Sequence, residues 1–285
     1  MSISRFPILF HVIYATMLLR LCHGSEGFDS RYSFSLTTFD PKGKLGQVER
    51  ALQAASLGTP VVALCRPDGI LIAAPQAVPS PLIHDDGTPR FTRVSRDIMI
   101  SHSGLGADGR VLSTAAQRLA VEHAYTFDEA IPIELFLEEM ALLFQEYTMK
   151  PASRPFGCSM LVAHVPTTGN NDDVQPELYC IDPSGSVESV TSSVVIGGLM
   201  GSLSMELKEA VDEEIILATT EESQYQIVDL MLKILQKNSP GHSDAAGSHQ
   251  RLTVLTAALM PGKDIKIRRH SAGALVAKHP PTIDE

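Results

Sequence analysis

The stretch from Arg31 to Leu57 constrains the fold most, because it predicts an extended segment, a turn and a helix in immediate succession. Apolar residues alternate with small polar ones over 32–38, which is typical of extended backbone. Residues 40–43, Asp-Pro-Lys-Gly, have the composition of a tight turn. The spacing that follows predicts a helix over 45–57 whose apolar positions are Leu45, Val48, Leu52 and Ala55. Any α/β domain could contain such a tail, turn and helix.

The exact residues of this stretch, beyond their pattern, resemble the opening signature of a proteasome alpha subunit, most closely the alpha type 2 branch. Further blocks follow in the order and spacing of that family: 103–112 (SGLGADGRVL), 145–148 (QEYT), 154–157 (RPFG) and 182–185 (DPSG). The resemblance covers 32–198 and weakens toward residue 267. A single block of this kind is weak evidence for the family, since Asp-Pro-Ser-Gly forms a turn in many proteins. Five blocks in order identify the chain as a member of the family.

The resemblance implies an α+β fold, a four-layer αββα sandwich of the N-terminal-nucleophile hydrolase type with two stacked antiparallel sheets and outer helices. It implies a noncatalytic structural and gating subunit in ubiquitin-dependent protein catabolism, without a cofactor. The expected partners are other alpha and beta subunits in stacked heptameric rings and the C-termini of activators or regulatory particles. The family location is cytoplasm and nucleus.

The family's gate uses a tail tyrosine, an adjacent polar residue, the turn proline and a tyrosine on the first helix. Tyr32, Ser33 and Pro41 match, whereas the helix position carries Arg50, which cannot replace both the ring and the hydroxyl of a tyrosine. The resemblance assigns ring assembly to the helix, where the interface candidates are Val48 and Leu52 and the nearby Ala55. It also assigns activator docking to a lysine position, where Arg90, or Arg93 if the preceding loop shifts the alignment, would offer a cation for a carboxylate.

Active members of this fold expose a threonine by cutting the preceding glycine bond, and Gly58-Thr59 lies almost where that junction would fall. The resemblance places Pro75 at the position of the required carboxylate and Arg90 near the position of the required lysine. A guanidinium stays protonated and cannot shuttle a proton. We therefore predict that Thr59 is an ordinary strand residue. The chain also has no Gly-x-Ser-x-Gly elbow, and the apolar strand around Cys158 would raise a thiol pKa.

Composition excludes some classes of function. The chain has 285 residues with 23 basic and 33 acidic side chains, a formal charge of −10, and no basic cluster, which argues against nucleic-acid binding. Its cysteines have no metal-type spacing and indicate buried reduced thiols; they are Cys22, Cys65, Cys158 and Cys180. His84 beside Asp85 and Asp86 predicts a solvated turn rather than a metal site.

Residues 1–30 form an extension that the family lacks. Arg5, an apolar run over 6–19 and small residues around Gly24 resemble a secretory signal peptide. The run is shorter than a membrane span requires. Three interpretations stay open: a leader to an endomembrane or plastid-type compartment, an unused upstream start, or a retained apolar tail. The domain proper is expected over 31–285, with the helix segment over 39–57, a mobile linker at 238–249 and a disordered tail after about 270.

Periodicity predicts alternating groups of strands and helices. The predicted strands are 60–65, 69–74, 91–94, 98–102, 156–165, 177–181, 187–196, 251–259 and 265–268. Arg66-Pro-Asp-Gly69 predicts a hairpin between the first two. The predicted helices are 108–124, 133–147, 200–211 and 221–235. The first is expected to have one apolar face of Val111, Leu112, Ala115 and Leu119, and the second to turn inward Leu135, Phe136, Met140, Leu143 and Phe144.

A loop is expected at 75–89, and the strands at 156–165, 177–181 and 187–196 are expected to form a second sheet.

Two alternatives to a noncatalytic subunit remain. A diverged, targeted paralogue acting as a scaffold outside the cytosol is favoured by Arg50 and the leader-like extension. An active threonine peptidase would require cleavage between Gly58 and Thr59.

Overall fold

The computed structural model describes residues 35–77, 90–166, 175–198, 252–260 and 266–271. The helices are α2 (Gly46–Ser56), α3 (Gly106–Phe127) and α4 (Ile133–Met149). The strands are β1 (Val61–Arg66), β2 (Gly69–Ala77), β3 (Phe91–Arg93), β4 (Ile98–Gly104), β5 (Cys158–His164), β6 (Glu177–Ile181), β7 (Val187–Val190), β8 (Ser193–Ile196), β9 (Leu252–Leu259) and β10 (Lys266–Ser271).

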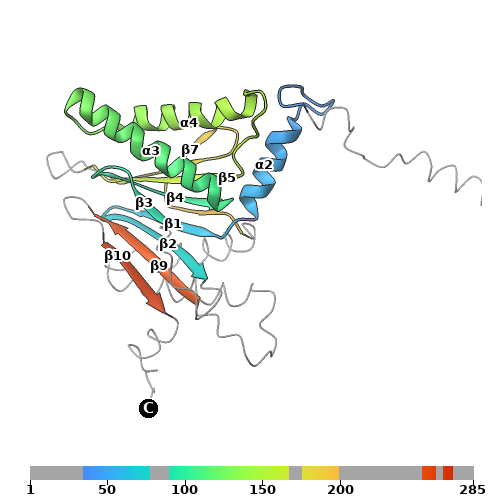
Figure 1. Ribbon diagram of the computed structural model, residues 1–285. Helices are drawn as coiled ribbons and strands as arrows, with labels where there is room; N and C mark the ends of the chain where they lie inside the picture. Colours follow the sequence, from blue (N-terminus) through green and yellow to red (C-terminus); the bar gives the residue numbers. More distant parts are fainter. Residues whose placement is uncertain (1–34, 78–89, 167–174, 199–251, 261–265, 272–285) are drawn as a thin grey trace, which may run out of the picture.

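The strands form two antiparallel sheets of five strands each. One has the order β10-β9-β2-β1-β8, and the other has the order β3-β4-β5-β6-β7. The sheets stack face to face, α3 and α4 cover the second sheet, and α2 stands at one end of the sandwich (Figure 1). This arrangement confirms the predicted α+β sandwich of the N-terminal-nucleophile hydrolase type. The helices predicted over 200–211 and 221–235 lie outside the described residues.

Two apolar layers hold the described sandwich together. Between the helices and the second sheet lie large side chains from α4, including Phe136, Met140 and Phe144, against Ile98 and Ile100 of β4. Between the two sheets the layer is formed by residues such as Ile70, Ile72, Met99, Leu161 and Leu178. Alternate residues of β4 and β5 therefore serve different layers, as the period of a strand requires.

The predicted hairpin at Arg66-Pro-Asp-Gly69 is confirmed. Strands β1 and β2 pair antiparallel with Arg66 opposite Gly69, so Pro67 and Asp68 form the loop. Gly69 has φ of +147°, and a methyl group there would lie 2.1 Å from the carbonyl oxygen of Leu259, so the position requires glycine. The loop expected from residue 75 begins later, because β2 continues through Pro75 to Ala77, paired with β9.

The assignment of strands to sheets differs from their order along the chain. The predicted strand 187–196 is two strands: β7 pairs with β6 in the second sheet, whereas β8 pairs with β1 in the first. Strands β3 and β4 join β5 instead of β1 and β2. Periodicity finds strands but carries no information on non-local pairing, so this part of the expectation was wrong.

The two long helices differ in how well sequence predicted their buried faces. For α4 the prediction is confirmed, since Phe136, Met140 and Phe144 are fully buried. For α3 the prediction is right in part: Leu112 is fully buried and Leu119 packs against the core, whereas Val111 is exposed. The other buried positions include small residues that were not predicted, Gly109, Ala116 and Ala120. A methyl group on Gly109 would lie 2.0 Å from the His102 ring, so small residues are what let α3 approach β4 closely.

Candidate functional site

The turn before α2 is built by one carboxylate. Oδ1 of Asp40 accepts hydrogen bonds from the backbone N–H groups of Lys42 at 2.9 Å and Lys44 at 2.8 Å. Gly43 has φ of +77°, a conformation that glycine adopts without strain. Pro41 lies exposed within this turn, as the predicted turn chemistry requires. Tyr32 and Ser33, the other gate candidates that match the family, lie outside the described residues.

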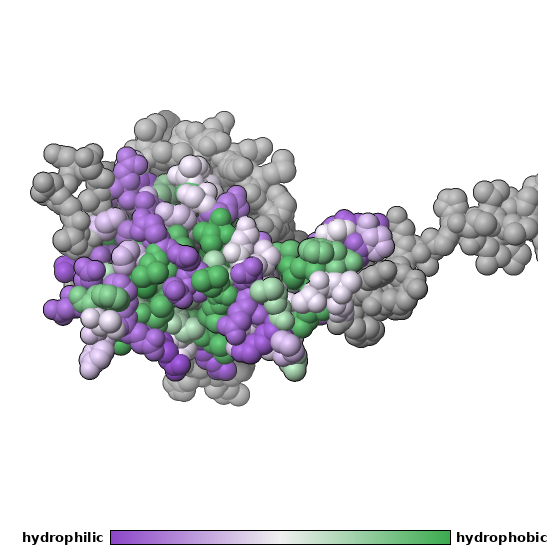
Figure 2. Space-filling model, turned by 90° about the horizontal axis from the view of Figure 1, so that it is seen from above, coloured by the Kyte–Doolittle hydropathy of each residue, from purple (hydrophilic) through white to green (hydrophobic). Residues whose placement is uncertain are grey.

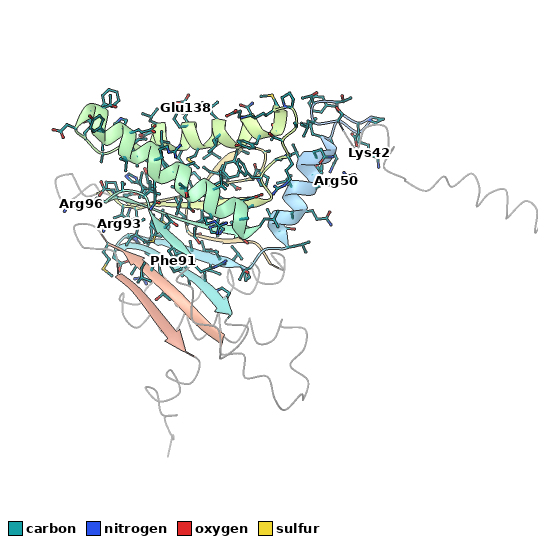
Figure 3. The ribbon with its side chains drawn as sticks, in the orientation of Figure 1. Lys42, Arg50, Phe91, Arg93, Arg96 and Glu138 are labelled. Atoms are coloured by element: carbon teal, nitrogen blue, oxygen red, sulfur yellow. The ribbon has the colours of Figure 1, made fainter. Side chains whose placement is uncertain are left out.

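Helix α2 begins after Leu45, ends before Leu57 and packs against β4 and β5. Its inner side consists of Ala51 and Ala55, which are buried, whereas Val48 and Leu52 are half-buried. The predicted apolar face is therefore displaced toward the smaller residues. The exposed Arg50 and the neighbouring turn residue Lys42 lie at the α2 end of the sandwich, far from Arg93 and Arg96 (Figure 3).

Close to α2, three segments of the chain pack against one another directly through their backbones. A methyl group on Gly58 would lie 1.9 Å from the amide nitrogen of Gly104, and one on Gly104 would lie 2.3 Å from the carbonyl oxygen of Gly157. We call Gly58, Gly104 and Gly157 the glycine floor. Sequence reasoning missed it, although each of the blocks 103–112 and 154–157 contains one of its members.

The Gly58–Thr59 junction, the candidate cleavage site, is held on both sides. The N–H of Gly198 donates to the Gly58 carbonyl at 2.7 Å. The Thr59 carbonyl accepts from the Ser103 hydroxyl at 2.8 Å and from Nη2 of Arg90 at 3.4 Å. Arg90, which the resemblance placed near the family's lysine position, thus lies beside Thr59. Pro75, at the family's carboxylate position, lies buried in β2 opposite Val254.

The two candidate docking arginines have different surroundings. Arg90 is half-buried, its Nε has no hydrogen-bond partner among the described residues, and burial lowers the pKa of its guanidinium. Arg93 is exposed at the end of β3, where its Nε donates to the Ser95 carbonyl at 3.1 Å. The structure thus directs Arg90 inward and leaves Arg93 accessible.

Burial shifts the pKa values of two thiols and one imidazole within the described residues. Burial, with the charge of Asp108, raises the pKa of the Cys158 thiol to about 12, and burial raises that of Cys180 to about 12. Burial and the charge of Arg90 lower the pKa of His102, so its imidazole is neutral at pH 7. Three of the four cysteines are within the described residues; these three are free thiols, of which Cys158 is buried, as predicted, whereas Cys65 and Cys180 are half-buried.

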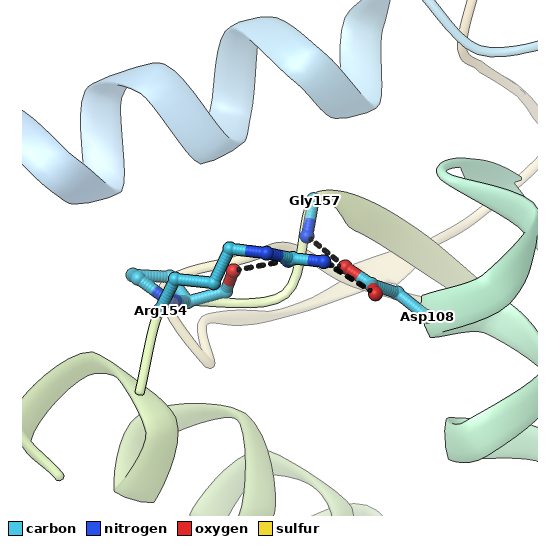
Figure 4. A network of polar contacts seen from close by, with 4 residues as sticks. Asp108, Arg154 and Gly157 are labelled. Carbon is cyan, nitrogen blue, oxygen red and sulfur yellow. Dashed lines mark hydrogen bonds and ion pairs between the residues drawn. The ribbon is translucent and has the colours of Figure 1, made fainter. Parts of the chain in front are cut away.

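A polar network that sequence reasoning did not assign lies between α2, α3 and α4 (Figure 4). Arg154 donates to both carboxylate oxygens of Asp108, at 2.6 and 2.8 Å, and the N–H of Gly157 donates to Oδ2 at 2.9 Å. Burial alone would raise the pKa of Asp108, but these hydrogen bonds and the charge of Arg154 outweigh it and lower the pKa. Both residues lie in the quoted family blocks, and that was the available signal.

The described residues contain no group of three or more histidine, cysteine, aspartate and glutamate side chains arranged to hold a metal ion. His84 lies outside them. Of the helices in the described parts, none is both long enough and apolar enough to span a bilayer.

Residues 55–246 match the family described as Proteasome subunit. The chain belongs to the proteasome subunit family. It is 38% identical over 167 residues to proteasome subunit alpha type-2-A of Arabidopsis thaliana, covering 59% of this chain and 68% of that protein. It is 31% identical over 220 residues to proteasome subunit alpha type-2 of Dictyostelium discoideum, covering 74% of this chain and 92% of that protein.

The alpha type-2 subunit of Drosophila melanogaster is 40% identical over 156 residues, which covers 55% of this chain and 64% of that protein. These similarities confirm the predicted resemblance to proteasome alpha subunits of type 2. In that setting α2 and the turn before it are the candidate assembly surface, and the Gly58–Thr59 junction is the candidate remnant of a catalytic centre.

Proposed function

We propose that this chain is a noncatalytic, alpha-type subunit of a proteasome core particle. It would provide structure and gating in ubiquitin-dependent protein catabolism. The observation that carries the proposal is the Gly58–Thr59 junction. Its two carbonyls are engaged by Gly198, Ser103 and Arg90, and the cation beside it is a guanidinium, which cannot act as a proton shuttle. An uncut junction of this kind leaves no free amine to activate Thr59.

Assembly into a ring of alpha subunits, stacked on beta subunits, is proposed to use the α2 segment. Phe39 before α2 is 63% exposed and Leu57 after it is 79% exposed, while Val48 and Leu52 are half-buried. Viewed from the α3–α4 side, this segment projects from the body and carries apolar surface, whereas polar and apolar residues are mixed over the helices (Figure 2). Exposed apolar residues at a projecting element favour a protein–protein interface.

Gating is proposed to involve Tyr32, Ser33 and Pro41 together with the position of Arg50. A guanidinium offers planar hydrogen-bond donors where an aromatic ring with a hydroxyl is expected, so the gate at this subunit would differ from the usual arrangement. An Arg50→Tyr variant assembled into the particle is expected to change the basal hydrolysis of a small peptide substrate. Unchanged basal hydrolysis would argue against a gating role for this position.

For the docking of activator C-termini, Arg93 is the better candidate of the two arginines. It is exposed, whereas Arg90 is half-buried and already donates to the Thr59 carbonyl. An Arg93→Gln variant should lose binding of a peptide that ends in a free carboxylate, with the amidated peptide as control, whereas Arg90→Gln should retain it. The reverse result would return the role to Arg90.

Native purification of the endogenous protein, with mass spectrometry of its partners and of its own N-terminus, tests the whole proposal. Co-purification with other alpha subunits and with beta subunits, and an uncut Gly58–Thr59 bond, are expected. A product that begins at Thr59 would establish the peptidase alternative. Recovery outside any such particle from an endomembrane compartment would establish the targeted paralogue and overturn the proposed location in cytoplasm and nucleus.

A further inference from the structure

At Ala54, helix α2 packs on the backbone of a glycine. A methyl group on Gly157 would lie 3.4 Å from the Cβ of Ala54 and 2.8 Å from a methyl carbon of Leu105, so both side chains already pack against this glycine. At the end of the helix, Gly58 lies directly on Gly104. The position of α2 is therefore set by where the backbone of the glycine floor lies.

Gly157 is fixed through both of its backbone polar groups. Its N–H donates to Oδ2 of Asp108 at 2.9 Å, and its carbonyl accepts from the N–H of Leu105 at 2.9 Å. Asp108 is itself held by two hydrogen bonds from Arg154. Such a bidentate, charge-assisted pair fixes the orientation of a carboxylate as well as adding binding energy.

We propose that Asp108 and Arg154 are positioning residues for α2. The guanidinium orients the Asp108 carboxylate, the carboxylate holds the Gly157 amide, and Gly157 sets the surface on which Ala54 packs. The functional meaning of this inference rests on the proposed function, in which α2 is the surface that assembles with other subunits. The positioning itself concerns the single chain and can be measured without a ring.

A simpler role for the pair would be to stabilise α3 alone. Asp108 lies in the first turn of α3, where a negative charge favours the positive end of the helix dipole. In that case loss of Arg154 would loosen the start of α3 and leave α2 unaffected. The two roles therefore predict different places of change.

Hydrogen exchange of backbone amides in the full chain separates them. In Arg154→Gln, exchange over α2 is expected to rise about tenfold, the effect of losing a hydrogen bond to a charged group, while exchange in α4 stays near the wild-type rate. Arg154→Lys keeps the charge but loses the planar fork, so it should restore part of the protection. Increases confined to α3, or equal increases in all elements, would overturn the inference.

Lys150→Gln is the matched control. Lys150 forms an ion pair with Glu146, with 3.1 Å between Nζ and Oε1. Neither residue contacts the Gly157 amide, which is bound by Asp108. The control removes one cation and one ion pair, and it should leave α2 exchange unchanged. Comparable loosening of α2 in this control would refute the specific role of Arg154.

Incorporation of the same variants into purified particles tests the functional meaning separately. If α2 is the assembly surface, Arg154→Gln should enter particles less efficiently than Lys150→Gln. If α2 loosens and incorporation is equal, the positioning inference stands and the proposed assembly role of α2 fails.

Discussion

The glycine floor beneath α2 and the apolar layer beneath α4 hold helices against the same sheet by opposite means. Under α4, large side chains such as Phe136, Met140 and Phe144 fill the space between helix and strands. At α2, the side chain of Ala54 packs on Gly157, and Gly58, which follows the helix, lies on Gly104 with no room for a methyl group. One helix is spaced by side-chain volume and the other by contact with glycine backbone.

The difference determines what each region tolerates. A layer of flexible side chains can repack when one of them changes shape, because rotamers adjust. A contact between two main chains cannot adjust in this way, because moving it displaces whole strands. Substitutions that add a little volume should therefore be far more damaging at the floor than comparable changes under α4.

The largest effect is expected from Gly58→Ala. The added methyl group would lie 1.9 Å from the Gly104 nitrogen, so α2 or β4 must move, and we expect a loss of about 4 kcal/mol or more in the free energy of unfolding. Urea denaturation followed by circular dichroism measures it. Gly106→Ala is the control: nothing lies within 4 Å of the added carbon, and a gain of about 0.5–1 kcal/mol is expected. Equal effects at both positions would contradict the backbone-contact description.

A smaller loss is expected from Phe144→Leu in α4. Phe144 is fully buried and its ring contacts Phe156 edge-on, with ring centroids 5.6 Å apart. The replacement stays apolar and can repack, so we expect a loss of about 1–1.5 kcal/mol by the same denaturation measurement. A loss as large as that of Gly58→Ala would show that this layer is as rigid as the floor.

Low pH should weaken the hydrogen bond by which Asp108 holds Gly157 of the glycine floor. Because the pKa of Asp108 is lowered below its ordinary value of 3.8, its ionised form stabilises the folded state, and that contribution is complete above about pH 5. It is lost as the pH falls through the folded pKa. The difference in unfolding free energy between wild type and Asp108→Asn should therefore be constant from pH 5 to 7 and shrink below pH 3.8. A difference independent of pH down to pH 2 would rule out this linkage.

The smallest effect is expected from Leu57→Ser. Leu57 is 79% exposed in the single chain, so its replacement should change the free energy of unfolding by less than about 0.5 kcal/mol. If the α2 segment is an assembly surface, the same variant should nevertheless enter particles poorly. Normal incorporation would remove Leu57 from the interface.

The sequence predicted the fold best where large apolar side chains make the contacts between elements. Large apolar residues gave the correct face of α4, and the hairpin around Pro67 and Asp68 followed from turn chemistry. The face of α3 was only partly predicted: Leu112 was found, but Gly109, Ala116 and Ala120 were missed because they carry little hydrophobic signal. The division of strands between sheets depends on non-local pairing, which no local pattern encodes.

The candidate site shows the same limit. The family resemblance named the α2 segment, the Gly58–Thr59 junction and Arg90 as candidates, and the structure brings Arg90 to the Thr59 carbonyl. It did not reveal that Arg90 points inward or that Asp108 and Arg154 meet. Those two residues are 46 positions apart, and only the packing of α3 against the start of β5 brings them together.

The crossing from β7 to β8 has a mechanical consequence. Only Thr191 and Ser192 separate the last residue of β7 in one sheet from the first residue of β8 in the other. Thr191 and Ser192 are both bends, and the Ser192 carbonyl already accepts a hydrogen bond from the N–H of Cys65 in β1 at 2.7 Å, so the link is short and ends against the first sheet. The two sheets are therefore covalently tied along the edge formed by β7 and β8. A pulling force can separate the sheets at the opposite edge, but beside this link the sheets cannot slide past each other.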